Sequence, residues 1–112
     1  MDDQKVEYAS LSLTFLETIS KESKSLSERA SMLLEEESKV PMISALQNEL
    51  ITMQMAFFSL NYFCVEAIET CHITDDKIVE VPSQHFLKIA DASQIGVQAY
   101  TEAQKYISFS YH

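Results

Sequence analysis

The chain has very few of the residues that make tight turns. Its 112 residues include one glycine and two prolines. Sandwiches and barrels need a turn roughly every ten residues, and glycine and proline supply most of these turns. The shortage therefore excludes such folds and favours a small number of long helices. The length suits a single helical-bundle domain over residues 1–112.

Positive charge is also scarce. Eight lysines and arginines stand against 17 aspartates and glutamates, which gives a formal net charge of −9. Binding to nucleic acid or to an anionic membrane requires many basic side chains that displace counterions. We therefore expect neither of these partners. An acidic chain of this kind is suited to a basic protein partner, or its charge serves only solubility.

Long hydrophobic runs are missing as well. The most apolar stretch, residues 53–65, is interrupted by Gln54, Ser59 and Asn61, and it is too short and too polar to cross a bilayer. The first 15 residues carry three acids and one lysine, whereas a signal peptide begins with basic residues and an apolar core. These features predict a soluble, cytoplasmic protein.

The two cysteines, Cys64 and Cys71, are seven residues apart in a helical pattern. Seven residues correspond to about 10 Å along a helix axis. This separation exceeds the reach of a disulfide bond. We therefore expect two free thiols in a reducing compartment.

The apolar residues that are present recur with helical spacing and predict three long helices, over residues 3–37, 41–71 and 83–109. Short connections between them predict an all-α, up-down-up antiparallel bundle. A break in the Ser-rich stretch 20–27 would make the bundle four-helical. Between the second and third helices, Asp75 and Asp76 suit a turn, and residues 77–81 alternate as an extended segment does.

The second helix carries two apolar rows rather than one. The first follows the 3,4 alternation of a heptad core: Ile43, Leu46, Leu50, Met53, Phe57, Leu60, Cys64, Ala67 and Cys71. The second lies about 140° away and contains Ile51, Met55, Phe58, Tyr62 and Val65. A helix with two such rows must be covered on two sides. Together with the aromatic C-terminal end, this predicts a surface for a homodimer or another protein partner, formed by Ile51, Met55, Phe58, Tyr62, Tyr106, Phe109 and Tyr111.

The stretch QHFLKIADASQIG, residues 84–96, resembles the signature H-x-L-K-G-x-x-A-x-x-G of histidine phosphotransfer domains over about a dozen residues. The resemblance implies that His85 carries a phosphoryl group and that Lys88 supplies a nearby positive charge. Ile89 stands where that family has glycine, and it belongs to the apolar row of the third helix. The same row contains Gly96, which predicts close packing between helix backbones at this place.

A third pattern concerns metal ions. Glu69 and His72 form a Glu-x-x-His pair, the spacing that places both ligands on one helical face in carboxylate-bridged di-iron bundles. We expect His85 and Asp76 near them at the same end of the bundle. A di-iron site needs a second such pair, and the chain has three histidines without one. Glu69 and His72 therefore remain candidate ligands, and no other cofactor is expected.

Catalytic motifs are otherwise lacking. Neighbours such as Cys71 and His72 diverge by about 100° on a helix, so they do not form a nucleophile-base pair. A Gly-rich phosphate loop or a nucleophile elbow cannot be built with one glycine. The sequence therefore favours a non-catalytic interaction protein: an adaptor, a chaperone, an immunity or antitoxin-like inhibitor, or an assembly subunit.

Overall fold

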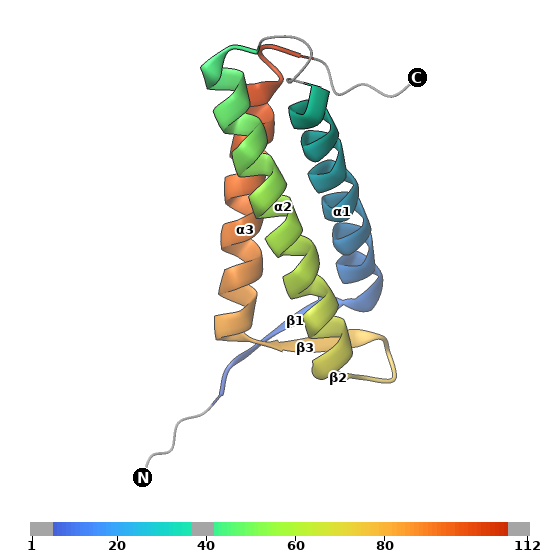
Figure 1. Ribbon diagram of the computed structural model, residues 1–112. Coiled ribbons are helices and arrows are strands. Elements are labelled where there is room, and N and C mark those ends of the chain that lie inside the picture. Colours follow the sequence, from blue (N-terminus) through green and yellow to red (C-terminus); the bar gives the residue numbers. More distant parts are fainter. Residues whose placement is uncertain (1–5, 37–41, 108–112) are drawn as a thin grey trace.

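The computed structural model describes residues 6–36 and 42–107. The elements in chain order are β1 (Tyr8–Ser12), α1 (Leu13–Glu36), α2 (Ser44–Thr70), β2 (His72–Ile73), β3 (Ile78–Pro82) and α3 (Ser83–Ala103). The three helices lie side by side with α2 between α1 and α3, and the strands cross one end of this layer (Figure 1). The prediction of a mainly helical chain with three packed helices is confirmed.

The all-α prediction holds only in part, because three strands form an antiparallel sheet in the order β1-β3-β2. The extended segment expected at residues 77–81 corresponds to β3. Residues 8–12, which we placed in the first helix, pair with β3, so that Ala9 lies opposite Val81 and Leu11 lies opposite Val79. Val79 and Val81 are fully buried. The sequence YASLS alternates well enough to form a strand, but whether it does so depends on the distant segment with which it pairs.

The start of α1 is fixed by the strand before it. Ser12 ends β1, and its Oγ accepts a hydrogen bond of 3.2 Å from the backbone N–H of Phe15. A serine oxygen in this position satisfies one of the donors that the first turn of a helix leaves open. The first helix therefore begins at Leu13, about ten residues later than predicted. Residues 3 and 37, where we expected its ends, lie outside the described residues.

The Ser-rich stretch does not break α1, so the four-helix alternative is wrong. The Oγ of Ser23 donates to the carbonyl of Ile19 over 2.6 Å. The Oγ of Ser27 donates over 3.0 Å to the carbonyl of Gln54 in α2. Both serines are buried, and each hydroxyl has a partner. These small side chains therefore bring α1 and α2 close together without leaving an unsatisfied polar group.

The other two helices are shorter than predicted. Ile43 has an extended backbone, so α2 begins at Ser44 rather than at residue 41, and Cys71 is again extended, so it ends at Thr70. The last helix ends at Ala103 and continues into a turn, short of the predicted end at residue 109. Phe109 lies outside the described residues.

The sheet ties the ends of the helices together. In the hairpin between β2 and β3, Lys77 adopts a left-handed conformation with φ of 64°, and its carbonyl accepts a 2.9 Å hydrogen bond from the N–H of Leu13 at the start of α1. The N–H of Ser83, the first residue of α3, donates over 2.9 Å to the carbonyl of Glu7. These hydrogen bonds to the sheet therefore fix the N-terminal ends of α1 and α3.

The core lies along the first apolar row of α2. Seven of its predicted members are at most 6% exposed: Leu46, Leu50, Met53, Phe57, Leu60, Cys64 and Ala67. Among the described residues, α1 and α3 pack extensively against α2 and hardly against each other. One face of α2 is therefore buried, while none of the described helices covers the opposite face.

Of the described helices, α2 alone is long and apolar enough to cross a membrane, although we expected its most apolar part to be too short. Length and composition are a weak indication, because the core helix of a soluble protein has the same properties. About one third of the most apolar window of α2 is buried within the protein.

Candidate interaction surface

The second apolar row of α2 lies on the uncovered side of the helix. Ile51, Met55, Phe58 and Tyr62, which we call the outer row, are 40%, 65%, 66% and 56% exposed. Val65, the last member of the predicted row, is only partly exposed. The residues predicted on α2 to contact a partner therefore do face solvent.

A groove of about 490 Å³ runs beside the outer row between α2 and α3. We call it the outer groove; it is lined by Thr52, Met55, Ala56, Ser59, Phe63, Lys88, Asp91, Ala92 and Ile95. Ala56 and Ala92 are 8% exposed, and their small side chains leave the space in which the groove lies. Because Met55 belongs both to the outer row and to the groove, the two form one continuous surface.

Charge is sparse on this surface. Lys88 and Asp91 carry opposite charges and stand three residues apart on α3, so they are neighbours on the helix surface. The ammonium of Lys88 lies 5.9 Å from the ring centroid of Phe63. This distance suits a cation-π contact. The aromatic ring therefore holds the positive charge at the edge of the groove.

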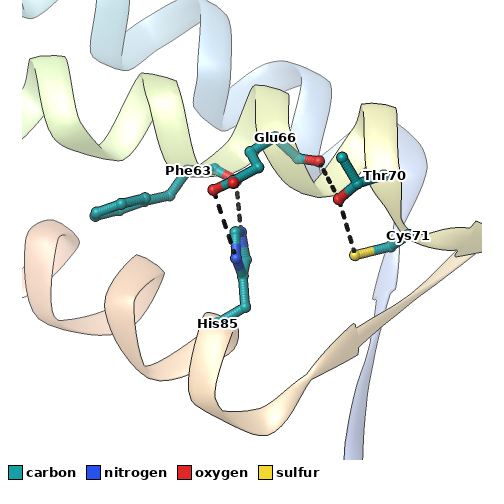
Figure 2. A network of polar contacts seen from close by, with 5 residues as sticks. All are labelled: Phe63, Glu66, Thr70, Cys71 and His85. Carbon is teal, nitrogen blue, oxygen red and sulfur yellow. Dashed lines mark hydrogen bonds and ion pairs between the residues drawn. The ribbon is translucent and has the colours of Figure 1, made fainter.

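His85 joins α3 to α2, and Figure 2 shows its ring between the two helices. Its Nε2 is 2.8 Å from the carbonyl oxygen of Phe63. A carbonyl only accepts, so Nε2 carries the proton and donates it. The Nδ1 atom faces Glu66 Oε1 at 3.7 Å, and the His85 side chain is 15% exposed.

This arrangement bears on the phosphotransfer hypothesis. A phosphoryl transfer to His85 requires a ring nitrogen that a second protein can approach. Here Nε2 is bound to a main-chain carbonyl, Nδ1 faces a carboxylate, and Lys88 lies over the ring of Phe63. The contacts of His85 therefore support a role in holding the first turn of α3 against α2.

The candidate metal ligands are not gathered in one place. Glu69 lies in the last turn of α2, whereas His72 belongs to β2, so the prediction that both lie on one helical face is wrong. His72 pairs across the sheet with Glu80, Asp76 is exposed in the hairpin turn, and His85 contacts α2. In residues 6–36 and 42–107, no group of three or more His, Cys, Asp or Glu side chains could hold a metal ion.

Tyr106 is the one predicted C-terminal surface residue within the described part of the chain. Tyr106 is 47% exposed and follows the end of α3. Phe109 and Tyr111 lie outside the described residues. Conversely, sequence reasoning missed the contribution of α3 to the groove, although Lys88, Ala92 and Ile95 show a 4,3 spacing that could have indicated it.

The two thiols differ in their surroundings. Both cysteines are free, with Cys64 buried and Cys71 partly exposed. Burial raises the pKa of the Cys64 thiol to about 11. Only the thiolate reacts readily with disulfide reagents. Cys64 is therefore doubly protected, by lack of access and by its pKa.

We expect Ellman's reagent at pH 8 to react with Cys71 at least about 100-fold faster than with Cys64, because Cys64 must wait for the core to open. Cys71→Ser should abolish the fast phase, and Cys64→Ser should leave it intact. Burial raises the pKa of the Cys64 thiol from about 9 to about 11 in the folded state. The protonated thiol is therefore compatible with the folded protein below about pH 9, and the free energy of unfolding should fall as the pH rises from about 9 toward 11. Equal labelling rates for the two thiols would contradict this assignment.

Known proteins add no further indication of what this surface binds. The chain matches no protein family model, no curated protein sequence and no solved structure.

Proposed function

We propose that this chain is a non-catalytic protein-protein interaction module that binds its partner through the outer row and the outer groove. The observation that carries the proposal is the exposure of four large apolar side chains in one row, directly beside a groove. Large exposed apolar patches on soluble proteins mark interaction sites more often than single exposed residues do.

The form of the surface suits a helical partner segment. A groove between two helices accepts an amphipathic helix that places apolar side chains at positions i, i+3 or i+4, and i+7. Met55, Phe63 and Ile95 supply apolar contacts along the groove. Lys88 and Asp91 at its edge would orient the partner through charged contacts, which give specificity more than affinity.

The proposal places the protein among the cytoplasmic adaptors, chaperones, immunity or antitoxin-like inhibitors, and assembly subunits. The net charge of −9 supports a protein partner rather than nucleic acid or an anionic membrane. In this proposal, the hydrogen bond between His85 and the carbonyl of Phe63 has a structural role, because it links α3 to α2, the two helices that form the groove.

The chain offers a matched pair of variants for the test. Met55→Glu with Phe58→Glu places two charges on the outer row, whereas Met32→Glu with Phe15→Glu places the same charges on α1. The four side chains have comparable exposure, at 65% and 66% on α2 against 61% and 52% on α1. Both variants should therefore keep the helical circular dichroism spectrum and the melting temperature.

Affinity capture from the native host is then compared among the wild type and the two double variants. Any captured protein is purified, and its Kd is measured with each chain. We expect the outer-row variant to bind at least about 10-fold more weakly, since hot spots lie in such apolar centres. The α1 variant should bind like the wild type. Equal binding by both variants would remove the outer row as the binding surface.

A further inference from the structure

We infer that the occupant of the outer groove is a second copy of this chain, in a twofold dimer in which Met55 and Phe58 of each copy enter the groove of the other. This inference rests on the proposed function and names the partner. A twofold interface uses the same surface on both copies, so that surface must carry both a projecting part and a hollow. The outer row and the outer groove are such a pair, because they lie side by side and share Met55.

The spacing of the outer row supports pairing of α2 with itself. Ile51, Met55, Phe58 and Tyr62 follow a 4,3,4 alternation, the spacing with which helices interlock side by side. The core row of the same helix shows this alternation where it packs within the chain. A second α2 running in the opposite direction would offer a matching row over the same length. Met55, Phe58 and Tyr62 in this row are of the residue types enriched in interfaces.

The charges at the groove also favour a second copy over a strongly basic partner. The groove is lined by one cationic and one anionic side chain, Lys88 and Asp91. In a twofold dimer, Lys88 of one copy can face Asp91 of the other. The chain as a whole carries −9, so two copies repel each other elsewhere, and the surface with balanced charge is where they meet at the lowest electrostatic cost.

The exposed area is of the right size. Each large aromatic side chain can bury 150–250 Å², and the outer row with Ile95 is 40–66% exposed, so the apolar contribution is on the order of 500 Å² per copy. A standard interface buries about 800 Å² per partner, of which a polar rim forms a substantial part. The outer row, the groove and their rim therefore supply enough surface for a stable dimer.

Sedimentation equilibrium of the full chain tests the inference, with the wild type and the two double variants above. We expect the wild type and the α1 variant, Met32→Glu with Phe15→Glu, to be dimers in the micromolar range. The outer-row variant, Met55→Glu with Phe58→Glu, should be monomeric, with a dimer Kd at least about 100-fold higher. A dimer that persists unchanged in the outer-row variant would overturn the inference.

A charge exchange tests the twofold arrangement itself. Lys88→Asp alone should weaken the dimer about 10-fold, because an acid then faces Asp91 of the other copy. Lys88→Asp combined with Asp91→Lys should restore the wild-type Kd, since the pair is again complementary. If the double variant has a dimer Kd as high as that of the single variant, Lys88 and Asp91 do not face each other in the dimer, and the twofold arrangement is contradicted.

The dependence of binding on salt distinguishes a second copy of the chain from a basic protein partner. Raising the concentration of NaCl from about 50 to about 500 mM should lower the dimer Kd, because salt screens the repulsion between two acidic chains. A complex with a basic protein should weaken under the same conditions.

The inference and the proposed function can fail separately. If the wild type is monomeric at all concentrations while a captured protein fails to bind the outer-row variant, the dimer is excluded and the proposed function survives. If neither self-association nor any captured protein depends on the outer row, both fail.

Discussion

Replacing Leu50 with alanine is expected to lower the free energy of unfolding by about 2–5 kcal/mol, a large part of the stability of a domain of this size. Leu50 is fully buried in the core row of α2, and α2 packs against both other helices. The loss combines the transfer of buried methyl groups with the cavity that the rigid surroundings cannot fill. Urea denaturation followed by circular dichroism measures it.

The control for this prediction is the same substitution at an exposed leucine. Leu87 lies on α3 and is 57% exposed, so Leu87→Ala should change the free energy of unfolding by no more than about 0.5 kcal/mol. A Leu50→Ala variant as stable as Leu87→Ala would show that the core row does not lie where the three helices meet.

Replacing Gly96 with leucine is expected to cost about 3 kcal/mol or more, because a core that is already full must accept a large side chain. A Cβ atom added at Gly96 would lie 2.9 Å from both Cε1 and Cζ of Phe57. Phe57 is only 4% exposed, so its ring cannot turn into solvent to make room. Thermal unfolding should show a melting temperature lower by more than about 10 °C.

Smaller and matched changes make this prediction sharper. Gly96→Ala combines the clash with a gain of about 1 kcal/mol in helix propensity, so we expect a loss of only about 0–2 kcal/mol. Gln98→Leu, at an exposed position of the same helix, should be nearly neutral. If Gly96→Leu does not fold, adding Phe57→Ala should restore folding, because it removes the atoms of the clash. A Gly96→Leu variant as stable as the wild type would contradict the packing.

The contact between Gly96 and Phe57 also bears on the proposed binding surface. The outer groove lies between α2 and α3, and its width depends on how closely these helices approach. Gly96 and Ala92 allow the close approach, and His85 fixes the first turn of α3. The stretch that resembles a phosphotransfer signature therefore contains three residues that shape the groove.

Two features of the helices could be predicted from the sequence alone, because they depend on local periodicity. The 3,4 alternation of Leu46, Leu50 and Met53 marks a buried row whatever lies opposite it. The second alternation, through Met55 and Phe58, marks a second row that this chain leaves in solvent. The deficit of glycine and proline correctly favoured long helices, and the spacing of the cysteines correctly predicted free thiols.

Other features were decided by contacts between distant parts of the chain. Residues 8–12 form a strand because they pair with β3, some seventy residues away, and no local pattern contains that partner. His72 does not lie on the helical face of Glu69, because α2 ends at Thr70 and His72 belongs to β2. Lys88, Asp91 and Ile95 reach the groove because α3 packs beside α2. The periodicity of one helix determines which of its residues are apolar on a given side, but the packing of its neighbours determines which side stays open.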